Sequence, residues 1–199
     1  MKRTQLDERL LKMREAAKLT RDPTAPDDTL DYLLTYLERC NPQKILEIGT
    51  AEGLTTCAML AACEATVTTI ELDAERANRA RENFAGFGVQ DRVRLLEGDA
   101  SEILPLLSGE YDMIFLDGPK VQYRRYFPDC KRLLKAGGAL LADDVLLFGW
   151  VSGETPTPPK RRMLVEHIRE YLQLVKDDPE FETEILKIGE GLAVSVKQK

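Results

Sequence analysis

The stretch KILEIGTAEG, residues 44–53, decides the fold class of this chain. Its first half is a short, mostly apolar segment of the kind that forms a buried strand. Its second half is a glycine-rich turn, and a helix is expected directly after it at 54–63. Gly49 and Gly53 allow the backbone to turn tightly and to approach a ligand closely. The stretch therefore predicts a strand, a turn and a helix of an α/β protein.

The same alternation continues along the chain. Further strands are expected at 66–72, 92–98, 111–117 and 138–143, with helices between them. Strands that alternate with helices favour a parallel, doubly wound sheet. The last two expected strands are joined by only GEG, so they must form an antiparallel hairpin. The sequence predicts an α/β fold with a Rossmann-like seven-stranded sheet, made of five parallel strands plus the C-terminal hairpin.

Two helices are expected before the first strand, separated by TRDPTAPDD at 20–28. We therefore expect an N-terminal helical extension at 1–40, followed by one domain at 41–199. The first helix carries an apolar stripe that must be covered by the sheet edge, by a partner subunit, or by both. A homodimer is the expected assembly. The stripe consists of Leu6, Leu10, Met13 and Ala17.

Composition limits the class of protein. The 199 residues carry a net charge of −6, so no global field attracts nucleic acid or anionic membranes, although a local basic patch remains open. No stretch approaches the roughly 20 apolar residues of a membrane span, and the N-terminus does not resemble a signal peptide. The four cysteines are scattered without a CxxC pair. Reduced thiols in a cytoplasmic protein are therefore expected.

The ends of the first three strands predict a nucleoside pocket. Glu47 would repel a pyrophosphate but could accept hydrogen bonds from an amino group, and the hydroxyl of Thr55 could meet a ligand. Glu71 could accept both hydroxyls of a ribose. Asp99 and Ala100 could border an adenine ring. S-adenosylmethionine fits such a pocket better than NAD does. The alternatives are an ordinary tight turn and acidic residues that only cap helices.

The ends of the fourth and fifth strands bring carboxylates together. Asp117 follows one apolar strand, and Asp143 and Asp144 follow the other. Parallel strands end at one edge of a sheet, and the two local sequences contain no arginine to offset the charge. Carboxylates in this number suit a hard divalent cation. Lys120 lies three residues beyond Asp117. The alternatives are an aspartate pair that caps a solvated loop and a lysine that is simply exposed.

The motifs EIGTAEG, TIELD, GDA, DGPK and DDVL occur in an order that resembles the class I S-adenosylmethionine- and metal-dependent O-methyltransferases of the catechol and caffeoyl-CoA type. The resemblance runs from about residue 25 to the end. The tail is most similar to the bacterial branch that methylates 5-hydroxyuridine at the tRNA wobble position, which gives 5-methoxyuridine. This similarity lies in DDVLLFGWV, PPKRRMLVEHIREY and ILKIGEGLAVSVK.

The resemblance implies roles for residues that match the motifs. It implies a cofactor site for S-adenosylmethionine, a site for Mg²⁺ or Mn²⁺, and a general base. The family usually has Asp-Asn where this chain has Asp143-Asp144, and the added charge should tighten metal binding. The implied metal ligands are Asp117, Asp143 and Asp144, the base is Lys120, and the cofactor residues are Ala25, Thr55, Glu71, Ala100 and Asp117.

Two features bear on the acceptor. Basic residues could contact phosphates, and Trp150 with Phe148 could stack on a base; a solvated helix face and loop anchors are the alternatives. We expect an enzyme that methylates either the tRNA anticodon loop or a small catechol-like molecule. A non-catalytic cofactor-binding partner module is the other class, and the intact acidic and lysine residues favour the enzyme. The basic residues are Arg124, Lys160, Arg161 and Arg162.

Overall fold

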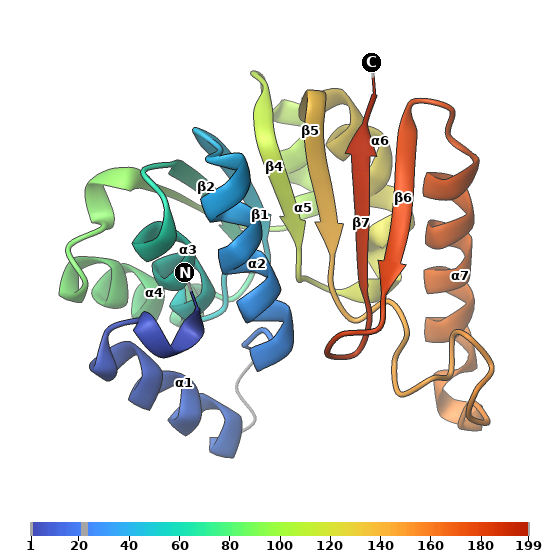
Figure 1. The fold of residues 1–199 in the computed structure, drawn as a ribbon, viewed down its shortest axis with the longest axis horizontal. Coiled ribbons are helices and arrows are strands. Elements are labelled where there is room, and N and C mark those ends of the chain that lie inside the picture. Colours follow the sequence, from blue (N-terminus) through green and yellow to red (C-terminus); the bar gives the residue numbers. More distant parts are fainter. Residues whose placement is uncertain (1, 21–23, 199) are drawn as a thin grey trace. The chain divides into compact units, whose positions relative to one another are not determined.

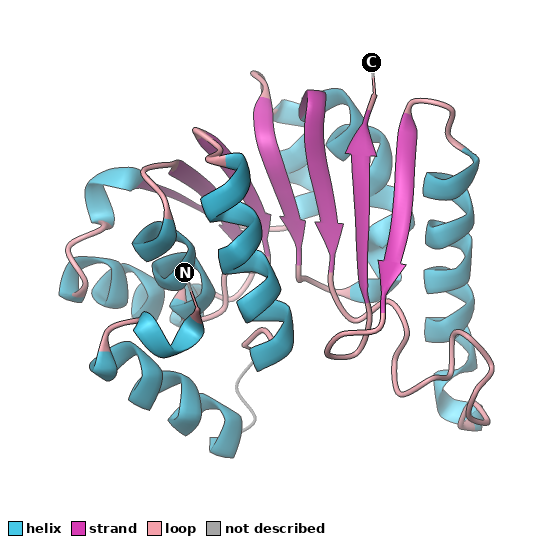
Figure 2. Cartoon of the chain, viewed as in Figure 1, coloured by secondary structure: helices cyan, strands magenta, loops and turns pink. Residues whose placement is uncertain are grey.

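The computed structural model describes residues 2–20 and 24–198, and the chain divides into two compact units, 1–100 and 101–199. Figure 1 labels the helices and strands of both units, and Figure 2 colours them by type.

The first unit is built on three parallel strands in the order β3-β2-β1. Ile45 and Leu46 of β1 are fully buried, as expected for a strand covered on both faces. The helices α3 and α4 follow β1 and β2 along the chain, and α4 is followed by the short turn η2. The bounds are β1 Lys44–Ile48, α3 Leu54–Ala62, β2 Thr66–Glu71, α4 Ala74–Gly86, η2 Gln90–Arg92 and β3 Val93–Glu97.

The N-terminal helices belong to the same unit. After the turn η1 (Arg3–Gln5), both α1 (Glu8–Thr20) and α2 (Asp27–Cys40) contact α3. The side chains of Leu6, Leu10 and Ala17 are at most 6% exposed. The stripe that was expected to need a sheet edge or a partner subunit is therefore covered largely within this unit. The apolar stripe therefore no longer supports a homodimer, which stays a prediction.

The second unit holds four strands in the order β4-β5-β7-β6. Strands β4 and β5 are parallel, whereas β7 runs antiparallel to both β5 and β6, which confirms the predicted hairpin. Strand β5 begins at Leu134, four residues before the expected start. The sequence predicted a helix at 121–135 before this strand, but α6 ends at Leu133, and Leu134 already pairs with Tyr111 of β4, before an irregularity in register. The bounds are β4 Tyr111–Leu116, β5 Leu134–Ala142, β6 Phe181–Leu186 and β7 Leu192–Lys197.

Two helices pack on each other in the second unit, α6 (Tyr123–Leu133) and α7 (Arg162–Asp177), and α7 also contacts β6. Their interface contains a row of aromatic rings, in which Tyr171 meets Tyr123 at 5.4 Å and Phe127 at 6.3 Å between ring centroids. Short elements complete the chain. They are α5 Ala100–Ile103, η3 Leu104–Leu106, η4 Lys120–Gln122 and η5 Pro159–Arg161.

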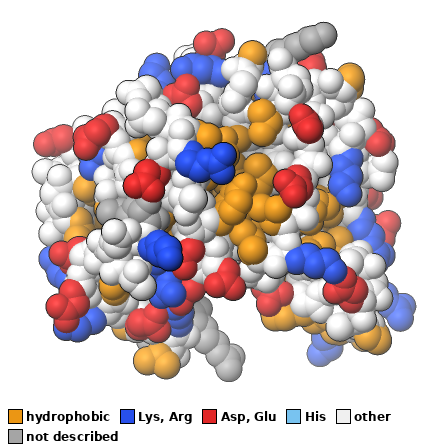
Figure 3. Space-filling view, viewed as in Figure 1, with side chains coloured by type: hydrophobic (Ala, Val, Ile, Leu, Met, Phe, Trp, Pro, Cys, Tyr) orange, Lys and Arg blue, Asp and Glu red, His pale blue; other side chains and the backbone are white. Residues whose placement is uncertain are grey.

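The surface in Figure 3 carries charged side chains of both signs around apolar side chains that gather near its middle. Within residues 2–20 and 24–198, no helix has the length and apolar character needed to cross a bilayer.

Candidate functional site

The glycine-rich turn after β1 has a backbone that requires glycine. Gly49 has a φ of 103° and Gly53 a φ of 75°, a region that other residues rarely adopt. A Cβ atom on Gly53 would lie 2.5 Å from the ring of Phe84 on α4. The N–H of Gly49 donates to the carbonyl of Ile70 at the end of β2. The turn is therefore held tightly between β2 and α4.

Helix α3 begins at this turn without a side-chain cap. Its N-cap residue is Gly53, which has no side chain to satisfy the first N–H groups. Thr55 lies in the first turn of the helix and is 7% exposed. Uncapped N–H groups at a helix start are a ready site for an anionic or polar ligand group. The turn is followed by a helix with Thr55 in its first turn, as the sequence predicts, and their contact with a cofactor stays a prediction.

Glu71 stands at the end of β2 with both carboxylate oxygens placed by the backbone. One oxygen accepts from the N–H of Ala51 at 2.7 Å, and the other accepts from the N–H of Asp73 at 2.9 Å. A carboxylate oxygen has a second lone pair, so each can still accept a hydroxyl. Glu71 therefore fits the role of a ribose acceptor and also stabilises the turn through Ala51.

Glu47 is placed differently from the expectation that it meets the cofactor. It is fully buried, and its Oε2 accepts from Thr56 at 2.5 Å and from Thr69 at 2.6 Å. Thr50 shares a further 2.6 Å hydrogen bond with Thr69. Its carboxylate thus takes part in a hydroxyl network that links the turn, α3 and β2. A direct contact between Glu47 and a cofactor remains a prediction.

The remaining cofactor candidates are spread over the unit. Ala25 is buried, and its carbonyl accepts from Arg14 at 2.6 Å. Asp99 is half-buried and Ala100 is 7% exposed, both just after β3. Asp73, just beyond Glu71, caps α4 by accepting from the N–H of Arg76.

The sequence reasoning missed Leu72. This side chain is 68% exposed between Glu71 and Asp73, although it directly follows a buried strand. An exposed leucine beside Glu71, the expected ribose acceptor, offers an apolar surface on which a purine ring could pack. The available signal was an apolar residue placed between two acids at a strand end.

In the second unit, the three predicted aspartates gather at one end of β4 and β5. Leu116 pairs with Ala142, so Asp117 and Asp143 follow neighbouring strand ends. The ammonium of Lys120 lies 3.1 Å from Asp117 Oδ1 and 3.0 Å from Asp144 Oδ2. Lys120 thus supplies part of the positive charge that the sequence reasoning assigned to a metal alone.

The charges in this cluster perturb one another. Burial raises the pKa of Asp143 from its ordinary 3.8 to about 8, with further increases from the charges of Asp117 and Asp144. Burial lowers the pKa of Lys120, but Tyr123, Asp117 and Asp144 raise it by more, so that it lies well above its ordinary value. The contacts with Asp117 and Asp144 therefore favour the ammonium form of Lys120 in this arrangement.

The donor chemistry of the cluster suits a hard cation. Three carboxylates and one ammonium leave an excess of negative charge, which adds to burial in raising the pKa of Asp143. Among the described residues, however, no three acidic, histidine or cysteine side chains are already arranged as metal ligands. Asp117 Oδ1 and Asp144 Oδ2 both contact Lys120, so these two atoms could bind a cation only after leaving that contact. The three carboxylates are therefore the right type of ligand for a divalent ion.

The loop after Asp144 presents two aromatic rings. Phe148 and Trp150 lie 4.9 Å apart between centroids, and Phe148 is 59% exposed. Arg169 on α7 anchors the loop by donating to the carbonyls of Trp150 and Val151, each at 3.1 Å. Leu147 and Phe148 both have positive φ angles. The loop that carries the aromatic pair is thus held by its hydrogen bonds to Arg169.

The basic run lies at the start of α7. Lys160, Arg161 and Arg162 are all exposed, and none of their side chains forms a hydrogen bond or ion pair with another described residue, although the backbone N–H of Arg161 donates to Pro158. Three cations at a helix N-terminus oppose the helix dipole, so this placement costs stability. An anionic ligand would pair with these cations and offset their unfavourable interaction with the helix dipole.

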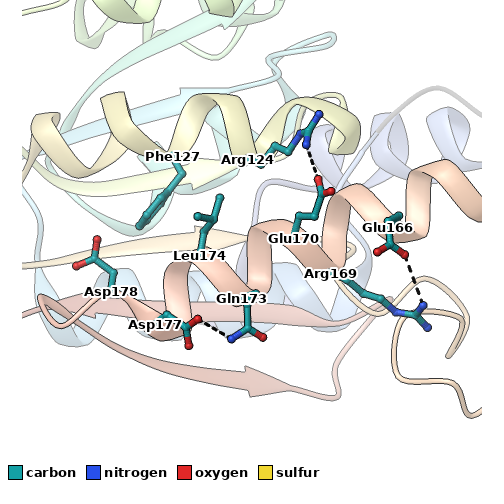
Figure 4. A pocket seen from close by; sticks show the side chains of 9 residues that line it. All are labelled: Arg124, Phe127, Glu166, Arg169, Glu170, Gln173, Leu174, Asp177 and Asp178. Atoms are coloured by element: carbon teal, nitrogen blue, oxygen red, sulfur yellow. Dashed lines mark hydrogen bonds and ion pairs between the residues drawn. The ribbon is translucent and has the colours of Figure 1, made fainter.

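Arg124 lies apart from that run. Its guanidinium pairs with Glu170 at 2.5 Å, in a groove of about 710 Å³ between α6 and α7 (Figure 4). His167, the only histidine, is half-buried on α7. Among the described residues, neither Arg124 nor His167 has a hydrogen bond or ion pair with the three aspartates.

Comparison with known proteins gives a consistent picture. The model of the O-methyltransferase family matches residues 4–198. A catechol O-methyltransferase from Niastella koreensis is 34% identical over 134 residues, which cover 64% of this chain and 61% of that protein. A putative O-methyltransferase from Mycolicibacterium smegmatis is 29% identical, with coverages of 83% and 79%. The chain spans 49% of the O-methyltransferase hkm8 of Aspergillus hancockii, at 32% identity.

Solved structures agree with the fold. A putative caffeoyl-CoA O-methyltransferase from Staphylococcus aureus superposes with a TM-score of 0.88 at 32% identity, covering 96% of this chain and 93% of that one. The methyltransferase PaMTH1 of Podospora anserina, solved with S-adenosylhomocysteine bound, gives 0.87 at 25% identity, with coverages of 98% and 89%. The predicted Rossmann-like fold with seven strands and a C-terminal hairpin is confirmed.

Proposed function

Because the chain belongs to the O-methyltransferase family, we propose that it methylates a hydroxyl oxygen of an acceptor with two neighbouring oxygens, using S-adenosylmethionine. The family and the arrangement of the turn after β1 support this donor. S-adenosylmethionine supplies an electrophilic methyl group on its sulfonium and leaves as S-adenosylhomocysteine. On the protein side, Glu71 binds the ribose, and Thr55 with the first N–H groups of α3 binds polar groups of the donor.

We further propose that Asp117, Asp143 and Asp144 hold a divalent cation, Mg²⁺ or Mn²⁺. Their oxygen donors and their excess negative charge support it. Such an ion, when bound, would interact with the acceptor oxygens and lower the pKa of the hydroxyl. The protein's own contribution is to keep three carboxylates at one strand edge, so that the acceptor is oriented before it reacts.

Lys120 is the proposed proton acceptor. In the structure, its contacts with Asp117 and Asp144 keep its pKa high. If these carboxylates held a cation instead, Lys120 would lose both contacts and its pKa would fall. Lys120 can then take the hydroxyl proton while the acceptor oxygen forms its bond to the methyl carbon and the carbon–sulfur bond breaks.

For the acceptor, we propose 5-hydroxyuridine at the wobble position of the tRNA anticodon loop, where the hydroxyl neighbours O4 of the base. One observation carries this choice. The exposed cations Lys160, Arg161 and Arg162 have no partner among the described residues and follow a loop that presents Phe148 and Trp150. Cationic side chains next to aromatic rings suit single-stranded nucleic acid.

A small catechol-like acceptor is the second candidate. The similarity to the catechol O-methyltransferase of Niastella koreensis favours it, as does the net charge of −6, which does not attract RNA overall. A cofactor-binding module without catalysis is the third, and the presence of Lys120 with all three aspartates argues against it.

A direct assay separates these candidates. The purified protein is given S-adenosylmethionine, Mg²⁺ or Mn²⁺, and either tRNA that carries 5-hydroxyuridine or catechol. Nucleosides and small products are then identified by mass spectrometry. We expect 5-methoxyuridine; methylated catechol alone would favour the second candidate, and no product with either acceptor would favour the third.

A charge variant tests the RNA contact. The triple substitution Lys160→Gln, Arg161→Gln and Arg162→Gln should weaken tRNA binding and reduce its salt dependence, because each lost phosphate contact lowers the salt slope by about one. S-adenosylmethionine affinity serves as the control and should not change. Unchanged tRNA affinity and salt slope would refute the contact.

A further inference from the structure

We propose that Tyr123 is a positioning residue, whose hydroxyl fixes the two strand ends that carry Asp117 and Asp143. The role concerns the aspartate cluster, and it rests on the proposed function only in so far as the cluster takes part in catalysis. The sequence reasoning did not single out Tyr123, which lies three residues beyond Lys120 at the start of α6.

The hydroxyl of Tyr123 lies where the two strand ends meet. It is 2.9 Å from the carbonyl oxygen of Leu116 and 3.3 Å from that of Asp143. The same Leu116 oxygen accepts from the N–H of Asp143 at 3.0 Å. A single hydroxyl proton therefore joins the last residue of β4 to the first residue beyond β5. Asp117 is bonded directly to Leu116, so the separation of the two aspartates depends on this junction.

The ring of Tyr123 cannot leave this place easily. The side chain is fully buried, and the ring of Tyr171 on α7 packs against it edge to face, at 73° between ring planes. Tyr171 in turn contacts Phe127, which contacts Phe181 on β6. Because Tyr123 is sealed from solvent, it does not touch an acceptor. It acts through Leu116 and Asp143.

Tyr171 offers a matched control in the same interface. It is also fully buried, and within residues 2–20 and 24–198 its hydroxyl has no hydrogen-bond partner. Substituting phenylalanine at either position removes one oxygen atom and keeps the ring. Only Tyr123→Phe removes a contact with the strand ends.

The first test needs neither metal nor activity. Amide hydrogen exchange is measured by NMR on wild type, Tyr123→Phe and Tyr171→Phe, and corrected for global stability. We expect the Asp143 amide to exchange at least about 10-fold faster in Tyr123→Phe only. The Val145 amide, which donates to Gly191 at 2.9 Å, serves as the reference and should keep its rate. An unchanged Asp143 rate in Tyr123→Phe, or an equal change in both variants, would overturn the proposal.

The second test measures binding of Mn²⁺ alone by calorimetry. Loss of a residue that orients metal ligands typically weakens metal affinity 10- to 100-fold. We expect a loss in this range for Tyr123→Phe and less than a twofold change for Tyr171→Phe. If wild type binds no Mn²⁺ while the Asp143 amide still responds to Tyr123→Phe, the positioning role stands and the metal proposal fails. If Mn²⁺ binds equally to all three proteins, the positioning role fails and the metal proposal stands.

Discussion

Replacing Asp143 with asparagine should stabilise the metal-free protein at neutral and alkaline pH. The substitution keeps the size of the side chain, and the Oδ1 atom can still accept from the N–H of Asp144, at 2.9 Å in the structure. It removes a charge that is almost wholly buried beside two other carboxylates. The effect on stability follows from the raised pKa of Asp143.

Below about pH 4, Asp143 is protonated in both the folded and the unfolded chain, so its ionisation contributes nothing to stability. Between pH 4 and about pH 8, the unfolded chain loses this proton while the folded chain keeps it, so stability falls as pH rises. Above about pH 8, the penalty is complete. The whole gap corresponds to about 6 kcal/mol at 1.36 kcal/mol per pKa unit. Because neighbouring carboxylates share the proton, we expect a loss of at least about 3 kcal/mol.

The assay is urea unfolding of the metal-free protein from pH 4 to pH 9, followed by circular dichroism. Wild type should lose stability over this range, and Asp143→Asn should lose several kcal/mol less. Asp91→Asn removes an exposed charge and serves as the control, with wild-type behaviour expected. The reasoning fails if Asp143→Asn has the same pH dependence as wild type.

Three further predictions concern the proposed ligand sites. Glu71→Gln removes a charged acceptor and should weaken S-adenosylmethionine binding by about 1–3 kcal/mol in calorimetry, so an unchanged affinity would exclude the ribose role. Gly53→Ala places a Cβ 2.5 Å from Phe84 at a φ of 75° and should cost about 1–3 kcal/mol in thermal unfolding. A cost below about 0.5 kcal/mol would contradict the tight turn. Asp144→Asn removes one contact that raises the pKa of Lys120, so it should keep methyl transfer but need more Mg²⁺, and complete loss of activity would contradict this.

Much of the fold could be predicted because its signals are local. The segment KILEIGTAEG combines a buried strand, two glycines with positive φ and a helix start within ten residues. The short GEG connection left only an antiparallel hairpin. The extension of β5 back to Leu134 could not be predicted, because residues up to 135 were expected to continue the preceding helix. The pairing of Leu134 depends on Tyr111 of β4, which lies more than twenty residues away in the sequence.

The candidate site also has features that the sequence reveals and features that it does not. The position of each aspartate at a strand end was visible in the sequence, as was the family, which is confirmed by the match over residues 4–198. The contacts of Lys120 with Asp117 and Asp144 were not, because they depend on side-chain direction. Neither was Tyr123, whose role depends on two carbonyl oxygens that no sequence pattern reveals.

The charge balance of the cluster ties these observations together. Three carboxylates lie at one strand edge with a single ammonium, so full ionisation leaves two negative charges in excess. The protein offsets part of that excess by raising the pKa of Asp143, which keeps a proton on one carboxylate up to about pH 8. A cluster needed only for folding would be more stable with fewer carboxylates. The excess equals the charge of one divalent cation, so the same residues that destabilise the metal-free fold are suited to bind such an ion.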